Sequence, residues 1–322
     1  ELAAVLNDIS SKVQAELEAG HQVFFDLTGG ETLPLVAFGM LSKEFQAPMH
    51  RYDVYKNEML EYGYEGCPRF SEVASYDPIL LDLDSYIALY GGTINYRMHK
   101  DFKETYSEED RRDIEELWKL SRAYHSKWVY YSALFRKFVP DANLRVSVDE
   151  KLVLAEAKKT QSIGSLATFQ RFLDECEAAG FLKDVSYSNG KYHYTYKNHA
   201  IQSYFWDSGS ILEMYTFLKE SKEDASDDCR VGVHIDWDGV IHGMSGKDVL
   251  NEIDILSIKN NLPTFISCKI GHVDQRALYE LEAVANRFGG KYSKKVLAVA
   301  KDVEVTHLLR AKEMRIEVRK EG

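Results

Sequence analysis

Two short apolar runs on either side of Asn260-Asn261 constrain the fold of this chain more than any other feature. Val249–Lys259 and Leu262–Lys269 have the length and the β-branched content of strands. Asn tolerates the positive φ that a two-residue hairpin turn requires. The sequence therefore predicts an antiparallel hairpin.

A turn at this point sets Asp254 opposite Ser267 and Glu252 opposite Lys269. Side chains alternate along a strand, so these four residues are predicted to share one face. Ile253, Ile255, Ile266 and Cys268 are expected to share the other face and supply the core. Two carboxylates beside one lysine can hold a divalent cation and position an attacking water. A solvated polar face with a Glu252–Lys269 pair explains the hairpin alone equally well.

The elements around the hairpin have a definite order. A helix is predicted over Ser210–Lys219 and a strand over Val231–Trp237; the hairpin follows, then a helix over Asp274–Phe288 and a strand over Lys295–Ala300. The two carboxylates of Asp236 and Asp238 fit a turn at a strand end better than a metal site.

The front of the chain has the pattern of a parallel α/β sheet. A helix over residues 3–19 ends at Gly20, a strand covers 21–27, and Thr28-Gly29-Gly30 precedes a helix over Thr32–Phe45. Backbone N–H groups in such a turn suit an anionic ligand, although a structural role explains the glycines as well. Neither a Walker pattern nor GxGxxG is present, so nucleotide hydrolysis and dinucleotide redox chemistry lack support.

The middle of the chain is predicted to be mostly helical. Asp82 begins a short helix that stops at Gly91, and Ser107 begins a long helix that reaches about residue 137. A helix over Phe169–Ala179 and a hairpin with an Asn189-Gly190 turn follow. Helices followed by such a hairpin indicate a winged helix-turn-helix segment.

Composition limits the possible partners. At 322 residues, two or three domains are expected, and the formal net charge of −11 means that nucleic acid must be bound by a local basic patch. Arg287, Lys291, Lys294 and Lys295 are the candidate patch, which is predicted to lie beside the carboxylates of the hairpin. The four cysteines are scattered without a CxxC pair, which indicates reduced thiols in a cytoplasmic protein. No apolar run has the length of a membrane span.

The C-terminal section resembles the PD-(D/E)xK, restriction-endonuclease-like nucleases. The resemblance rests on Glu213, on Asn251-Glu-Ile-Asp254 and on Ser267-Cys-Lys269. It implies that Asp254 binds Mg²⁺ or Mn²⁺ with support from the helix residue Glu213. It also implies that Lys269 stabilises the scissile phosphate or orients the water, and that Glu252 binds metal or pairs with Lys269.

Ser267 departs from the family pattern, which has a carboxylate at that position. Some restriction enzymes with Ser-x-Lys take the missing acid from the following helix. Glu282 is the predicted substitute and metal ligand, with Glu280 as the alternative, because helical spacing does not decide between them.

Asp-Leu-Thr-Gly-Gly followed by a helix resembles the ligand loop of CARF domains, the Rossmann-like sensors of cyclic oligoadenylates. Together with the nuclease motifs, it makes the chain similar to the CRISPR-associated ancillary nucleases of type III systems. The expected domains are a CARF-like sensor at 1–92, whose first strands would precede Glu1, a connector with a winged-helix segment at 93–203, and an α/β nuclease domain at 204–322.

The resemblance implies a homodimeric nuclease of antiviral defence that cuts or nicks DNA, or RNA, when activated by cyclic tetra-adenylate. Thr28, Gly29 and Gly30 would contact this activator across a two-fold axis. One alternative is a ligand-controlled winged-helix regulator that binds DNA and whose nuclease fold is inactive because of Ser267. The other is an ungated DNA-processing enzyme, which the separate N-terminal unit disfavours.

Overall fold

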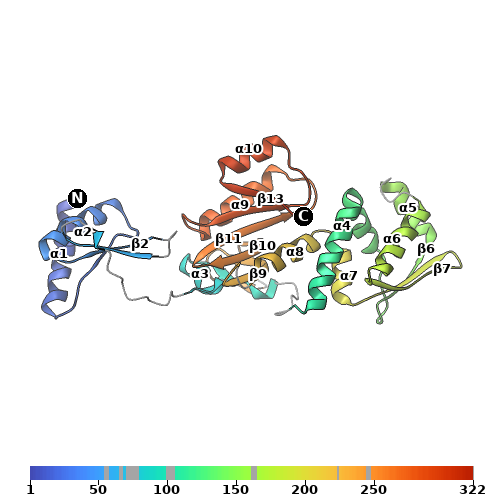
Figure 1. The fold of residues 1–322 in the computed structure, drawn as a ribbon, viewed down its shortest axis with the longest axis horizontal. Helices are drawn as coiled ribbons and strands as arrows, with labels where there is room; N and C mark the ends of the chain where they lie inside the picture. Colours follow the sequence, from blue (N-terminus) through green and yellow to red (C-terminus); the bar gives the residue numbers. More distant parts are fainter. Residues whose placement is uncertain are drawn as a thin grey trace. The chain divides into compact units, whose positions relative to one another are not determined.

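A computed structural model describes residues 1–53, 58–64, 68–69, 80–98, 106–160, 165–222, 225–243 and 248–321 (Figure 1). The chain forms two compact units, Glu1–Ile79 and Leu80–Gly322. It is a mixed α/β protein, as the sequence predicted. Among the described residues, no helix combines the length and apolarity that crossing a membrane requires.

The first unit is a small sheet with two helices. Its elements are α1 (Leu2–Glu18), β1 (Phe25–Asp26), α2 (Thr32–Phe45), β2 (Met49–Asp53), β3 (Glu58–Tyr62) and β4 (Pro68–Arg69). The strand order is β1-β2-β3-β4, with β1 parallel to β2 and the other pairs antiparallel. Its core contains Val13, Phe25, Leu41 and Ala47. The predicted strand–turn–helix is thus present, although its first strand covers only two residues.

The second unit is built on a six-stranded sheet of order β13-β12-β11-β10-β9-β5. Its strands are β5 (Thr93–Ile94), β9 (Asp228–Asp236), β10 (Leu250–Lys259), β11 (Leu262–Lys269), β12 (Lys294–Val299) and β13 (Ile316–Lys320). One core lies between the sheet and the helices α3 (Leu83–Leu89), α9 (Gln275–Phe288) and α10 (Val305–Glu313). The other core lies against the opposite face and includes α8 (Ser210–Glu220).

The predicted hairpin is present with the predicted register. Asn260 and Asn261 have φ of 49° and 61°, and Ile255 pairs with Ile266. Ile255, Ile266 and Cys268 lie in one core as expected, whereas Ile253 lies in the other. The prediction for Ile253 was wrong because the regular alternation of side chains is interrupted at this point of the β9–β10 pair. The β9–β10 ladder skips Asp254, and Gly232, at the matching position on β9, has φ of +63°.

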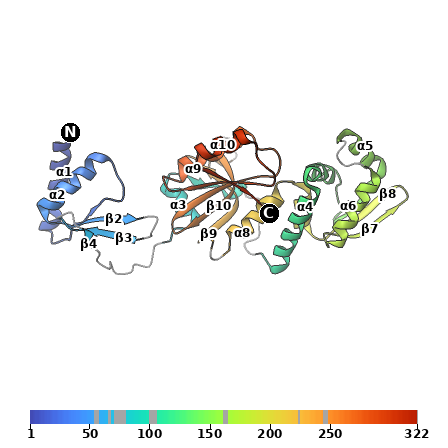
Figure 2. The same ribbon diagram turned by 45° about the horizontal axis from the view of Figure 1, so that its top comes forward.

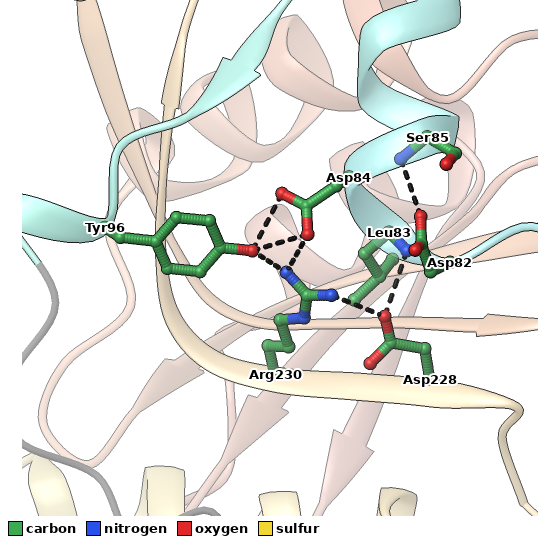
Figure 3. A network of polar contacts seen from close by, with 7 residues as sticks. All are labelled: Asp82, Leu83, Asp84, Ser85, Tyr96, Asp228 and Arg230. Carbon is green, nitrogen blue, oxygen red and sulfur yellow. Dashed lines mark hydrogen bonds and ion pairs between the residues drawn. The ribbon is translucent and has the colours of Figure 1, made fainter.

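The segment from Leu80 to Met98 packs on the six-stranded sheet. Arg230 on β9 binds the carboxylates of Asp84 at 2.7 Å and Asp228 at 2.9 Å, and it also contacts the Tyr96 hydroxyl (Figure 3). Asp228 accepts the backbone N–H of Leu83 at 3.0 Å. We expected a boundary at residue 92, but these contacts and the pairing of β5 with β9 place residues 80–92 in the second unit.

The connector shares a core with the six-stranded sheet. Its elements are the 3₁₀ turn η1 (Tyr96–Met98), α4 (Glu108–Phe135), β6 (Arg145–Asp149), α5 (Glu150–Thr160), α6 (Leu166–Ala178), β7 (Leu182–Ser188), β8 (Lys191–Tyr196) and α7 (His199–Trp206). The predicted helix start at Ser107, which forms a capping box with Asp110, and the predicted Asn189-Gly190 turn are both present. Figure 2 shows the β7–β8 hairpin beside α6. Helices α5 and α6 followed by this hairpin give the element order expected for a winged helix.

Candidate active site

Asp254 lies where β10 and β11 separate. The last ladder pair is Ile255–Ile266, and beyond it the Asp254 Oδ2 accepts the backbone N–H of Cys268 at 2.5 Å and the Ser267 hydroxyl at 3.1 Å. Lys269 Nζ is 3.9 Å from the same oxygen. The predicted approach of Asp254, Ser267 and Lys269 is therefore confirmed.

Burial raises the pKa of the Asp254 carboxyl. The nearby Lys269 charge and the hydrogen bonds from Cys268 and Ser267 lower the pKa, but they do not outweigh desolvation. Positive charge added beside Asp254 would stabilise its ionised form. A desolvated carboxylate with a specific charged partner in a cleft is typical of functional sites.

A cavity of about 240 Å³ opens over this carboxylate, between the hairpin and α9. The polar and charged residues that line it are Asn251, Glu252, Asp254, Ser267, Lys269 and Glu280. A shallower cleft of about 470 Å³ shares Asn251 and Glu280 and continues along α9 to Arg276 and Tyr279. The cavity and the cleft together give an elongated ligand access to Asp254.

Glu252 lies on the rim of the cavity. It pairs across the strands with His234 of β9, and its carboxylate is 3.8 Å from the His234 Nε2. We did not predict a role for His234. The signal available in the sequence was the two-residue spacing of His234 and Asp236 along the predicted strand 231–237, which puts both polar side chains on one face.

Glu213 on α8 approaches the hairpin from the opposite face of the sheet. Burial raises the pKa of the Cys268 thiol, and the charges of Asp254 and Glu213 raise it further. Both carboxylates therefore lie within electrostatic range of the same thiol. Glu213 is half-buried and is absent from the described lining of the cavity.

The structure distinguishes Glu280 from Glu282. Glu280 lines the cavity and pairs with Arg276 at 2.6 Å. Glu282 instead forms an ion pair with Lys295 and accepts a hydrogen bond from Asn286 at 3.0 Å. Residues two apart on a helix point in different directions. The residue at the cavity is thus Glu280, our alternative, rather than Glu282.

The donor set suits a hard divalent cation in chemical type. Carboxylates of Asp254, Glu252 and Glu280 line one cavity, and oxygen ligands are those that Mg²⁺ and Mn²⁺ prefer. In the part of the chain that the structure describes, however, no three His, Cys, Asp or Glu side chains are close enough together to hold a metal ion. The chemical type of these ligands therefore suits the metal, and their carboxylates would have to move closer to one another to bind it.

Asp236 and Asp238 form a turn, as predicted. The Asp238 N–H is donated to Asp236 Oδ1 at 3.2 Å, and the Val240 N–H to Asp238 Oδ1 at 2.9 Å. Such side-chain-to-backbone bonds are typical of turns made by Asp.

The predicted basic patch lies away from the site. In the parallel β11–β12 pair, Lys294 is level with Thr264, whereas Lys269 is level with Val299. Five residues of strand, about 16 Å, therefore separate the patch from Lys269 along the sheet. Lys295 is also almost buried in its pair with Glu282. We predicted the patch beside the acidic site, and this was wrong because sequence proximity did not indicate which strand end each lysine occupies.

In the first unit, the Thr28–Gly30 loop is held at the ends of β1 and β2. Asp26 accepts the Thr28 N–H at 2.8 Å, and the Thr28 hydroxyl accepts the Tyr52 N–H at 2.8 Å. Gly30 has φ of +129°, which other residues rarely adopt. Helix α2 begins directly after the loop, and Glu31 makes no side-chain capping bond there. The loop and the helix start leave backbone N–H groups for an anion.

The site of the second unit is a largely buried aspartate and a lysine on adjacent strands, beside a cavity lined by further carboxylates. Residues 203–321 match the family model of the Card1-like endonuclease domain. This match confirms the predicted resemblance to nucleases for the C-terminal section of the chain. No curated protein matches the chain in sequence.

Solved structures share the fold. Protein VC1899 from Vibrio cholerae has a TM-score of 0.68 at 16% identity, with 99% of this chain and 77% of that chain covered. Can2 from Sulfobacillus thermosulfidooxidans, in complex with cyclic tetra-adenylate, has a TM-score of 0.62 at 14% identity, with 99% and 76% covered. A type III CRISPR defence DNA nuclease activated by cyclic oligoadenylate overlaps less, with a TM-score of 0.40 at 13% identity and 93% and 35% covered.

Proposed function

We propose that the chain is a metal-dependent endonuclease that cleaves DNA, or RNA, and is activated by a cyclic oligoadenylate, with cyclic tetra-adenylate as the first candidate. The observation that carries this proposal is the desolvated Asp254 carboxylate, 3.9 Å from Lys269, over a cavity lined by further carboxylates. It lies within the segment that matches the Card1-like endonuclease domain.

In this proposal each site residue has a distinct task. Asp254 is the central metal ligand, and its bonds to Cys268 and Ser267 fix its position. Glu252, Glu280 and Glu213 are the candidates to complete the ligand set. A bound Mg²⁺ or Mn²⁺ would acidify a water and neutralise charge on the phosphodiester. Lys269 faces the same cavity, where its ammonium binds a phosphate oxygen and stabilises charge that develops during cleavage.

Activation is assigned to the first unit. Thr28, Gly29 and Gly30 form the anion-binding loop, and Can2, which shares the fold, is a complex with cyclic tetra-adenylate. A ligand with rotational symmetry fits a two-fold dimer, in which each chain presents the same loop. Binding would then favour the nuclease-competent arrangement by its differential affinity for that state.

Cleavage of labelled single-stranded DNA, plasmid DNA and RNA tests the proposal. Each substrate is incubated with Mg²⁺, Mn²⁺ or a chelator, and with or without cyclic oligoadenylates of different ring size. We expect cleavage that needs both metal and one of the activators, and that is lost in Asp254→Ala and Lys269→Ala. Lys312→Ala, at an exposed position on α10, is the matched control. No cleavage of any substrate under any condition would refute the nuclease, and cleavage that no activator changes would refute the gating.

The winged-helix-like segment supports a second candidate, a DNA-binding regulator. The three-stranded sheet β6-β8-β7 packs with α5 and α6, as in sequence readers. A regulator would bind duplex DNA tightly and leave it uncut under every condition of the same experiment.

A further inference from the structure

A second cavity of about 440 Å³ lies between α4 and the carboxyl ends of three parallel strands. Its lining includes the cations Lys119 and Arg122 from α4, Lys301 after β12, and Lys320 at the end of β13. We call it the basic groove. In open α/β sheets, ligands bind outside the carboxyl ends of the strands. This groove lies at such a position.

The basic groove begins beside the proposed catalytic lysine. Ile270, which directly follows Lys269, lines the groove together with Ala300. The Ala300 N–H is donated to the Lys269 carbonyl at 3.2 Å. Lys269 points to the α9 side of β11, while Ile270 packs with the core on the α4 side. The active-site cavity and the groove therefore lie at the same end of β11, on its two faces.

The charges of the groove are available to a ligand. Lys119 pairs with Glu116 and Lys320 with Asp302, each at 2.6 Å, and all four side chains are more than half exposed. Such exposed pairs contribute little and exchange readily. Arg122 and Lys301 take part in no ion pair with another described residue. Four cations thus gather in one hollow of a chain whose net charge is −11.

We propose that the basic groove binds the sugar–phosphate backbone of the polynucleotide substrate next to the cleaved bond and guides it to Asp254 and Lys269. The inference rests on the proposed nuclease function and adds the path of the substrate. The other lining residues are Trp118, Ser121, Ala123, Ile270 and Ala300. Trp118 and Ser121 are buried, and the Ser121 hydroxyl donates to the Trp118 carbonyl at 2.8 Å, so the groove offers its cations to phosphates rather than polar groups to bases. An evenly spaced row of phosphates matches cations supplied by three separate segments.

The test combines binding and cleavage. Two proteins that both carry Asp254→Asn are compared, one with the additional substitutions Arg122→Glu and Lys301→Glu and one without them. Fluorescence anisotropy of a labelled oligonucleotide across a salt series gives the affinity of each. We expect affinity to fall about tenfold or more, and the slope of log K against log salt to fall by about 1.8 for duplex DNA, since two phosphate contacts are lost. Lys312→Glu, an exposed reversal elsewhere in the same domain, should change neither quantity appreciably.

Cleavage of bis(p-nitrophenyl) phosphate separates this inference from the proposed function. This small diester reaches the active-site cavity without extending into the groove, so the double variant with Asp254 intact should cleave it at the wild-type rate while losing oligonucleotide cleavage. If the wild-type chain cleaves neither the small diester nor the oligonucleotide, the proposed nuclease function fails. The anisotropy measurements still test whether the basic groove binds the polynucleotide. Arg122→Gln/Lys301→Gln, which removes charge without reversing it, should give an intermediate loss. Unchanged affinity and salt slope in both double variants would overturn the inference.

Discussion

The Asp254 carboxylate accepts the backbone N–H of Cys268 at the point where β10 and β11 separate. The carboxylate oxygen takes the Cys268 N–H at 2.5 Å, just beyond the last ladder pair. A side chain that replaces a main-chain acceptor is fixed in position by the sheet itself. The catalytic candidate is therefore held in place before any substrate or metal arrives.

This relationship predicts different outcomes for two substitutions at position 254. Asp254→Asn keeps an oxygen that accepts the Cys268 N–H and removes a desolvated charge, so the free energy of unfolding should be unchanged or higher. Asp254→Ala leaves that N–H without its acceptor and should lower the free energy of unfolding by about 1–3 kcal/mol.

Both variants should lose cleavage by about 100-fold or more, because each removes the charge that the transition state requires. Urea unfolding and cleavage rates on the same preparations check this. A stable Asp254→Asn protein that still cleaves would show that Asp254 only supports the strand.

The contact network around Arg230 predicts a pH dependence of stability. Burial raises the pKa of the Asp228 carboxyl above its ordinary 3.8, an effect that the Leu83 N–H reduces and the charge of Asp82 increases. The native chain therefore holds this proton at a higher pH than the unfolded chain does. Stability falls as pH rises from about 3.8 through the raised native value, and is constant above it.

Asp228→Asn removes the carboxyl group that titrates but keeps an oxygen that accepts the Leu83 N–H. The melting temperature of wild type relative to Asp228→Asn should therefore decrease across this pH window. Asp84 and Tyr96, which also face Arg230, are present in both proteins, so they enter the difference only through their coupling to Asp228. A difference that is constant, or that grows with pH, would contradict the assigned pKa shift.

Local sequence patterns predicted the parts of the fold that local physics determines. The Asn260-Asn261 turn fixed the register of the hairpin, and Ser107 fixed the start of α4. Ile253 was placed in the wrong core because the cause, the positive φ of Gly232, lies on another strand.

The site residues also divide into those that one local element brings together and those that depend on how separate elements pack. Asp254, Ser267 and Lys269 are close because of one hairpin, so their approach was predictable. The choice between Glu280 and Glu282 depends on how α9 rotates against the sheet, which helical spacing leaves open. The basic groove combines α4 with the ends of β12 and β13, and no pattern along the chain brings these segments together.

The Thr28–Gly30 loop can be tested without disturbing the fold. Gly29 has no positive φ, and a Cβ built there meets no atom within 4 Å. Gly29→Val should therefore leave the melting temperature nearly unchanged while its side chain occupies the space of a bound ligand. We expect metal-dependent cleavage to lose its response to cyclic tetra-adenylate, with binding measured by calorimetry.

Gly39→Ala on α2, where a Cβ also meets nothing within 4 Å, is the control and should respond as wild type does. Wild-type activation of Gly29→Val would remove the loop from the ligand site.

Glu280 and Glu282, two residues apart on α9, provide a matched pair for the active site. Glu280→Gln changes a cavity residue whose only described ion pair, with Arg276, is exposed. It should lower the cleavage rate about tenfold or more and raise the metal concentration needed for half-maximal activity, with little effect on stability. Metal titrations of the cleavage rate measure both effects.

Glu282→Gln should behave in the opposite way. It removes the charged partner of Lys295, whose side chain is only 9% exposed, so the free energy of unfolding should fall by about 1–3 kcal/mol. The metal dependence of cleavage should stay that of wild type, because Glu282 faces Lys295 and Asn286 rather than the cavity. If Glu282→Gln instead shifts the metal titration and Glu280→Gln does not, the carboxylate that compensates for Ser267 is Glu282, and α9 must rotate on binding metal to bring it to Asp254.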